Sequence, residues 1–329
     1  MSAVIGSGSD VLSETLKRLY GLYRENRKHP GRLLRIGIKP RWNAVIGARN
    51  ECGLAINSAG VGSIYGKQGE PDLKTLRSFI GKPLFDIAEW GILSEEPLKR
   101  SIGIACMSAL SQRFLGCNGI RKRGFISQCW KAGGDFVQDY PALSHIINLD
   151  ETVAVVGYGS QITPLNTWCR KLHVIDVRPP ETFESVIIDE ECIDLPTAIE
   201  YHPPHDTTNI LGAADVVLLS TSTLVDNSFE LYVDAAKNAR LIGIFGLGSS
   251  LIPDAFFERG VDIFSSFRII DPVSFAMAME TDYDMEYSMK NSQKQYLMMR
   301  PSADFGDSPV AAFSRHTGIP GGHDEAPVG

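Results

Sequence analysis

The sequence predicts an α/β protein in which a doubly wound parallel sheet follows an N-terminal α+β domain. In the second half, five short apolar runs alternate with segments long enough for helices. Strands that are apolar throughout are buried on both faces, which is typical of a parallel sheet covered by helices. In the first half, strand-like runs come first and helical patterns follow, which favours a separate α+β unit.

The N-terminal domain is predicted over residues 1–148. Apolar side chains recur at helical spacing from Val11 to Tyr23, so this domain begins with a helix. Three strand-like runs separated by short turns then predict an antiparallel meander. These runs cover 33–38, 42–46 and 52–56. Helical patterns return over 72–80, 83–92 and 97–115.

The second domain is predicted over residues 149–285. Its five apolar runs cover 152–156, 172–177, 216–219, 241–245 and 261–264. Helices are predicted over 228–238 and 253–259. After residue 281 the pattern fades, and the last thirty residues are rich in glycine, proline and serine. We therefore expect a flexible C-terminal tail over 286–329.

The charge balance bears on the partners of the protein. Lys plus Arg number 32 and Asp plus Glu number 39, which gives a formal net charge of -7. This balance argues against nucleic acid and against anionic membranes, because both need a basic face. No apolar run approaches the roughly 18 residues of a membrane span, and residues 1–10 do not resemble a signal peptide. We expect a cytoplasmic protein with a small-molecule ligand, and leave a homodimer open.

Small and hydroxylic residues follow four of the predicted strands. In an open α/β sheet, ligands bind at the carboxyl ends of the strands, near the point where the strand order reverses. Glycines there let the backbone approach a ligand, and helix N-termini favour anionic groups. The candidate cofactor-binding residues at these ends are Gly157, Gly159, Ser160, Asp176, Ser220, Thr221, Ser222, Gly246, Gly248 and Ser249.

Gly157 and Gly159 have the spacing of a nucleotide-binding βαβ unit. Asp176 ends the next strand nineteen positions after Gly157, where an acid would bind a ribose hydroxyl. A nucleotide or S-adenosylmethionine is therefore one candidate cofactor. Ile162 stands where a third glycine is expected, and it would hinder the close packing of that fingerprint. The alternative interpretation is a tight turn with structural glycines.

His202-Pro203-Pro204-His205-Asp206 is the most ligand-like polar cluster. Two imidazoles and a carboxylate could hold a divalent transition metal, so we take His202, His205 and Asp206 as candidate metal ligands. The two prolines impose an extended backbone, so the rings need not converge. The alternative is a polar surface loop that the prolines stiffen.

Asp226 and Asn227 follow the third strand end, at the start of a predicted helix. Capping of that helix is one interpretation, because both residue types are favoured at helix N-caps. The other interpretation is a polar ligand contact at the edge of the pocket. The sequence leaves both open.

The second domain resembles a known family in three segments, at 215–228, at 245–253 and from Gly260 to Pro272. This is the "putative heavy-metal chelation" family. The resemblance implies a Rossmann-like second domain of unknown function, preceded by a domain similar to the N-terminal domain of enolase. Residues 53–55 and 101–105 look like pieces of that first domain. The resemblance spans about residues 10–285.

This chain departs from the family pattern where a pocket is expected. Asp226-Asn227-Ser228 stands in place of Asn-Gly-Thr, Gly246-Leu247-Gly248 differs from the usual Gly-Pro-Ser, and Ser266 replaces a glycine. We therefore expect a divergent member of the family. The fold implied by the resemblance does not depend on these positions, but the ligand does.

Three functions are compatible with the sequence. The first is binding or processing of a metal or metal chelate in an inter-domain cleft, which the His202–Asp206 cluster and the resemblance favour. The second is a biosynthetic enzyme that holds S-adenosylmethionine or a nucleotide at the strand ends, which Asp176 favours. The third is a non-catalytic scaffold. We favour the first.

Overall fold

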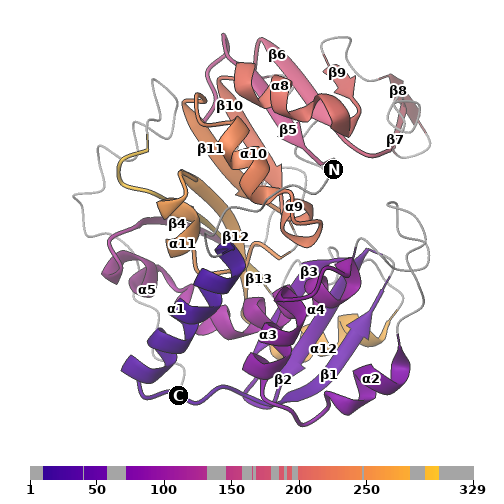
Figure 1. The fold of residues 1–329 in the computed structure, drawn as a ribbon, viewed down its shortest axis with the longest axis vertical. Helices are drawn as coiled ribbons and strands as arrows, with labels where there is room; N and C mark the ends of the chain where they lie inside the picture. Colours follow the sequence, from indigo (N-terminus) through magenta and orange to yellow (C-terminus); the bar gives the residue numbers. More distant parts are fainter. Residues whose placement is uncertain are drawn as a thin grey trace.

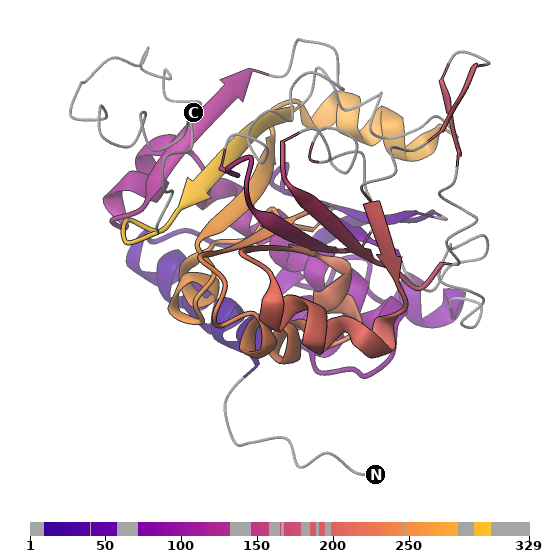
Figure 2. The same cartoon turned by 90° about the horizontal axis from the view of Figure 1, so that it is seen from above.

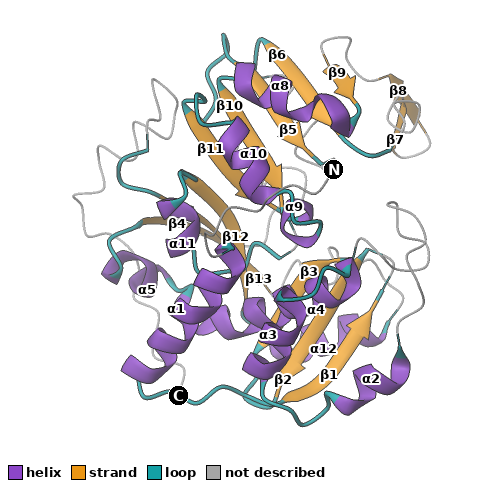
Figure 3. Ribbon diagram, viewed as in Figure 1, coloured by secondary structure: helices purple, strands orange, loops and turns teal. Residues whose placement is uncertain are grey.

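The computed structural model describes residues 10–39, 41–57, 72–131, 146–157, 165, 168–178, 185–188, 191–194, 199–246, 248–281 and 293–303. Two sheets dominate these residues (Figure 1). One is a three-stranded antiparallel sheet and the other an eight-stranded, mostly parallel sheet, with helices packed against both (Figure 3). The predicted fold class, α/β with an N-terminal α+β unit, is confirmed.

The small sheet is the predicted meander. It contains β1 (Leu33–Ile38), β2 (Trp42–Gly47) and β3 (Cys52–Ile56), paired antiparallel in the order β1-β2-β3. The helices of this unit are α1 (Val11–Glu25), α2 (Leu73–Ser78), α3 (Leu84–Ile92), α4 (Pro97–Ser111) and α5 (Cys117–Lys122). A 3-10 turn, η1 (Gln112–Phe114), extends α4. Asp10 caps α1 by accepting a 3.1 Å bond from the amide of Leu12.

Glycines let α4 pack directly on its neighbours. A Cβ added to Gly53 on β3 would lie 2.1 Å from the carbonyl oxygen of Ala105 on α4. A Cβ on Gly91 of α3 would lie 2.5 Å from the Cα of Gly103 on α4. Since no larger residue fits at these crossings, the glycines fix how closely the helices and the small sheet approach one another.

The large sheet has the order β4-β13-β12-β11-β10-β5-β6-β9. Its parallel strands are β5 (Thr152–Val156), β6 (Lys171–Ile175), β9 (Ile199–His202), β10 (Val216–Ser220), β11 (Leu241–Phe245) and β12 (Ile263–Ile269). The five predicted strands are thus all present. The order reverses at β5, which lies between β6 and β10.

The helices between residues 207 and 258 lie along one face of this sheet (Figure 2). They are α8 (Thr207–Ala213), α9 (Ser222–Val225), α10 (Phe229–Ala235) and α11 (Asp254–Glu258). A 3-10 turn, η3 (Pro204–Asp206), precedes α8, and a hairpin of β7 (Ser185–Ile188) and β8 (Glu191–Asp194) precedes β9. Among the described helices, none has the length and hydropathy to cross a membrane.

Two strands of the large sheet fall outside the residue range predicted for it. β13 (Gln293–Met299) lies within the segment expected to be a flexible tail, yet it pairs antiparallel with β12 over its whole length. Its other neighbour is β4 (Ile126–Lys131), which precedes the expected domain boundary. The large sheet therefore extends across both boundaries drawn from the sequence, at 148 and at 285.

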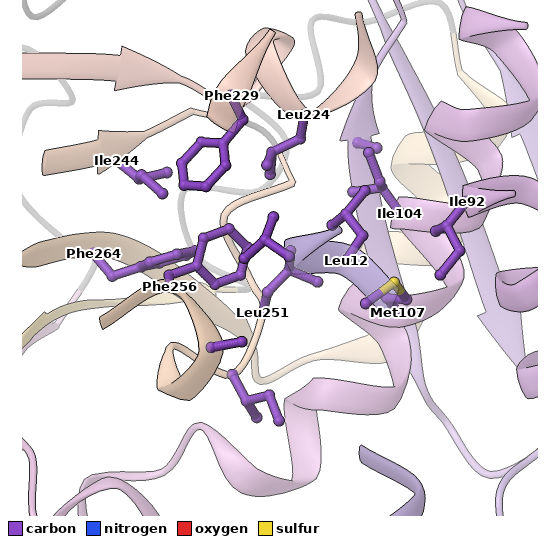
Figure 4. Close-up of a cluster of buried hydrophobic side chains, with 14 of the residues drawn as sticks. Leu12, Ile92, Ile104, Met107, Leu224, Phe229, Ile244, Leu251, Phe256 and Phe264 are labelled. Atoms are coloured by element: carbon purple, nitrogen blue, oxygen red, sulfur yellow. The ribbon is translucent and has the colours of Figure 1, made fainter. Parts of the chain in front are cut away.

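One buried cluster joins the two halves of the chain (Figure 4). It brings Leu12, Ile104 and Met107 from the first half together with Leu251 and Phe256 from the second. A second cluster lies on the other face of the large sheet and includes Val153, Leu172 and Leu218. A third lies between the small sheet and α12 (Pro272–Glu280), with Trp42, Leu54 and Phe275. The outer face of the small sheet is therefore covered by a helix from the second half.

Candidate metal site at the edge of the large sheet

Three potential metal ligands meet on β6 and β9. His173 lies on β6 directly opposite Glu200 on β9, and His202 ends β9 two residues later. Residues two apart on a strand share a face, so Glu200 and His202 point to the same side as His173. Each residue offers one ligand atom, and the three atoms all lie within 4.8 Å of one another. Parallel pairing of the two strands has thus brought together two histidines that lie 29 positions apart in the sequence.

The spacing of the three ligand atoms suits a transition-metal ion. His173 Nδ1 lies 2.8 Å from His202 Nε2, and Glu200 Oε2 lies 3.5 Å from the first nitrogen and 3.9 Å from the second. A point equidistant from the three atoms, in their plane, is about 2.0 Å from each, close to a zinc–imidazole bond length. An ion could therefore enter with small side-chain movements.

The two imidazoles are held in the neutral form that a metal requires. Partial burial lowers the pKa of His173, and His202 and Lys171 lower it further against the opposing effect of Glu200. Burial also lowers the pKa of His202, although Glu200 and Asp206 oppose the shift. Neutral rings keep the lone pairs that bind a cation. In the 2.8 Å contact between them, one ring nitrogen donates its N–H and the other accepts the hydrogen bond, so the donor ring must change tautomer before both nitrogens can bind a metal.

Lys171 orients the carboxylate of the cluster. Its Nζ lies 2.9 Å from Glu200 Oε1, which leaves Oε2 directed at the two imidazoles. The hydrogen bond from Lys171 is the main reason that the pKa of Glu200 is lowered. The carboxylate is therefore ionised, and it is already turned toward the ligand position.

His205 and Asp206 do not join this cluster. They lie in η3, just beyond β9, where His205 Nε2 is 3.5 Å from Asp206 Oδ2 and 76% of the His205 side chain is exposed. Of the three metal ligands expected from the sequence, the structure brings only His202 into a group of three. The prolines explain this, since Pro203 and Pro204 turn the chain away from the strand after His202.

The predicted strand-end residues come together at the carboxyl ends of β5, β10 and β11. Gly157 has φ 90°, and a Cβ there would lie 2.7 Å from the Cβ of Ser220. Gly246 has φ 108°, and a Cβ there would lie 3.0 Å from the hydroxyl of Thr221. Ser222 donates its backbone amide to the hydroxyl of Ser220. These contacts leave no room for a larger residue at either glycine.

Gly248 and Ser249 lie at the contact with the N-terminal unit. A Cβ on Gly248 would be 3.3 Å from the Cα of Ala55, and the Ser249 hydroxyl donates to the carbonyl of Gly246. Both residues are buried. This part of the inter-unit contact is therefore packed. Gly159 and Ser160, also expected at this site, lie outside the described residues.

Asp176 directly follows β6, at the position where the sequence predicts an acid that binds a ribose hydroxyl. Its carboxylate accepts both guanidinium bonds of Arg178, each 2.9 Å long, and a third bond from the Arg178 amide. A bidentate arginine occupies both carboxylate oxygens. In this structure, the carboxylate of Asp176 is therefore bonded to Arg178.

Asp226 and Asn227 close the turn after α9. Asn227 has φ 65°, a conformation that asparagine tolerates, and its side-chain oxygen accepts a 2.9 Å bond from Arg100. Arg100 is buried and also donates to the carbonyls of Ile92 and Leu224. Asp226 accepts from the amide and hydroxyl of Ser228. The bonds of Arg100 join α4 to the turn, whereas those of Asp226 lie within it. Both residues therefore have structural partners.

Two family profiles match the chain, over residues 25–111 and 142–298, and both are described as "putative heavy-metal chelation". The chain belongs to this family. An uncharacterized protein from Methanocaldococcus jannaschii is 25% identical over 226 residues, which cover 68% of this chain and 72% of that protein.

Solved structures of the family have the same fold. A protein of unknown function from Desulfitobacterium hafniense aligns with a TM-score of 0.59 and 18% identity, over 86% of this chain and 99% of that one. Another from Pyrococcus horikoshii aligns with a TM-score of 0.60 and 16% identity, over 88% and 100%. At this identity, the likeness extends to the fold alone.

Sequence reasoning missed His173 and Glu200. His173 only interrupts the apolar run at 172–177, and Glu200 lies in a segment with no strand prediction. The sequence contains two signals that could have indicated these residues. One is a histidine inside an otherwise apolar strand, and the other is a Glu-x-His pattern just before the two prolines. Only the pairing of β6 with β9 shows that the two signals belong to one place.

Proposed function

We propose that the protein binds a divalent transition metal through His173, Glu200 and His202. The observation that carries this proposal is the triangle of ligand atoms, with edges of 2.8, 3.5 and 3.9 Å. The family description supports the same kind of ligand. The proposal keeps the metal function that the sequence favours and replaces two of the three ligands.

The donor set selects the class of metal. Two imidazole nitrogens and one carboxylate oxygen suit zinc, nickel, cobalt and copper, whereas magnesium and calcium prefer oxygen ligands alone. Three protein ligands leave at least one coordination position open. Structural zinc sites are closed by four protein ligands, while sites that act on a bound molecule keep a position free. An open site suits a metal that is exchanged or bound as a chelate.

The location of the cluster differs from the expected inter-domain cleft. β9 is the last strand of the large sheet in the described part of the chain, at the end opposite β13 and β4. In Figure 1 this end of the sheet lies far from β1, β2 and β3. A metal at this outer edge would exchange with solvent or with a partner protein without any separation of the two units.

Metal stoichiometry tests the proposal. Chelator-treated protein is dialysed against zinc and, in parallel, against nickel, and bound metal is measured by mass spectrometry. We expect one equivalent in the wild type and in His205→Gln, and a loss of at least tenfold in affinity in His202→Gln and in His173→Gln. His205→Gln is the matched control, since it removes an imidazole three positions from His202 without touching the cluster. Equal affinity in the His202 and His205 variants would refute the proposed site.

A further inference from the structure

Lys171 places a positive charge beside the proposed metal ligands. It lies on β6 two residues before His173, on the same face of the strand, and its ammonium contacts Glu200 at 2.9 Å. The Lys171 side chain is 42% exposed and that of Glu200 is 49% exposed. The side of the cluster that carries Lys171 is therefore open to solvent.

The charges around the cluster favour an anionic co-ligand. A divalent ion held by Glu200 and two neutral imidazoles has one positive charge left over, and Lys171 adds a second beside it. Glu200 lies between Lys171 and the metal position but neutralises only one of these charges, so an excess of positive charge remains. A small carboxylate bound at the open coordination position would neutralise both charges, and Lys171 already binds a carboxylate in the protein.

We infer that the site takes its metal together with a small carboxylate chelator, and that Lys171 recognises the carboxylate. This inference rests on the proposed metal site and adds the class of molecule that completes it. The chelator would occupy the position that the three protein ligands leave free. Its second oxygen group would accept a charge-assisted bond from the Lys171 ammonium.

Oxalate and zinc provide the test. Zinc affinity is measured first for the wild type, Lys171→Met, Lys171→Arg and Arg170→Gln. Oxalate is then titrated calorimetrically into each zinc-loaded protein, and gel filtration records whether zinc and oxalate elute with the protein. We expect one oxalate per zinc. The affinity should fall about tenfold in Lys171→Met, the order expected for a lost hydrogen bond to a charged group. It should be largely kept in Lys171→Arg.

Arg170→Gln is the matched control because it removes the same charge one residue away, where the arginine is exposed and bonds Thr152. It should change oxalate affinity less than twofold. If zinc does not bind, the proposed function fails. If zinc binds but oxalate strips it, does not bind, or binds Lys171→Met as well as wild type, the carboxylate inference is overturned while the metal site stands.

Discussion

At the scale of single residues, the cluster depends on imidazoles that stay neutral while a carboxylate faces them. The causes act in opposite directions, since burial lowers the pKa of His173 and His202 while Glu200 raises both. Burial is the larger effect at each ring. At neutral pH both rings are therefore uncharged, and a cation has to displace only the proton that lies between the two ring nitrogens.

The titration of the two rings tests this balance. In metal-free protein, nitrogen-detected NMR should give midpoints for His173 and His202 below the ordinary value of 6.5. In Glu200→Gln both midpoints should fall further, because the substitution removes the negative charge that favours the imidazolium. A rise in either midpoint on this substitution would contradict the account. A circular dichroism spectrum unchanged from wild type is the control for folding.

At the scale of elements, much of the architecture follows from sequence pattern. The runs at 33–38, 52–56, 152–156 and 241–245 coincide with β1, β3, β5 and β11 because each is a local apolar run between turns. β13 escaped prediction because Gln293, Lys294 and Gln295 precede its apolar residues and break the pattern. Its place in the sheet comes from pairing with β12 and β4, which is a long-range property.

The candidate site, too, can be predicted in part from local sequence and in part only from strand pairing. His202 could be found from its neighbours in the sequence, because a histidine beside prolines and an acid is a local signal. His173 and Glu200 could not, since their relation to His202 exists only once β6 and β9 pair in one register. Asp176 and Asn227 were predicted as candidates, but in the fold Arg178 and Arg100 satisfy them. Their partners could not be inferred from spacing.

The crossing of α3 and α4 gives a prediction at this scale. Gly103→Ala should destabilise the protein by about 1–3 kcal/mol, because its Cβ would lie 2.8 Å from the amide nitrogen of Ile92 and the backbones would have to separate. Gly21→Ala is the matched control. It lies in α1 with only a side-chain oxygen 4.0 Å away, and should stabilise by about 0.5–1 kcal/mol. Urea unfolding measures both, and equal effects would contradict the packing argument.

At the scale of the whole molecule, the two units form one structure. Leu12 and Ile104 share a buried cluster with Leu251 and Phe256, and α12 from the second half covers the small sheet. Because this core crosses the boundary between the two units, unfolding of either unit would expose apolar side chains of the other, and we expect the two to unfold together. The two solved structures share the fold over 86% and 88% of this chain.

The role of β13 can be tested by truncation. A chain that ends after Ala303 keeps β13 and the bond from the Arg300 amide to the carbonyl of Asp262, so it should unfold at nearly the wild-type temperature. A chain that ends at residue 291 loses the strand between β12 and β4, together with the buried side chains of Met298 and Met299. We expect it to be insoluble or to melt far lower. Equal melting temperatures would show that this strand does not support the sheet.

Anomalous diffraction from crystals of the zinc-loaded protein would locate the metal itself. We expect one strong peak bonded to His173 Nδ1, Glu200 Oε2 and His202 Nε2, with distances of about 2.0–2.2 Å. A peak at His205 and Asp206, or at the strand ends around Ser220, with none between β6 and β9, would contradict it.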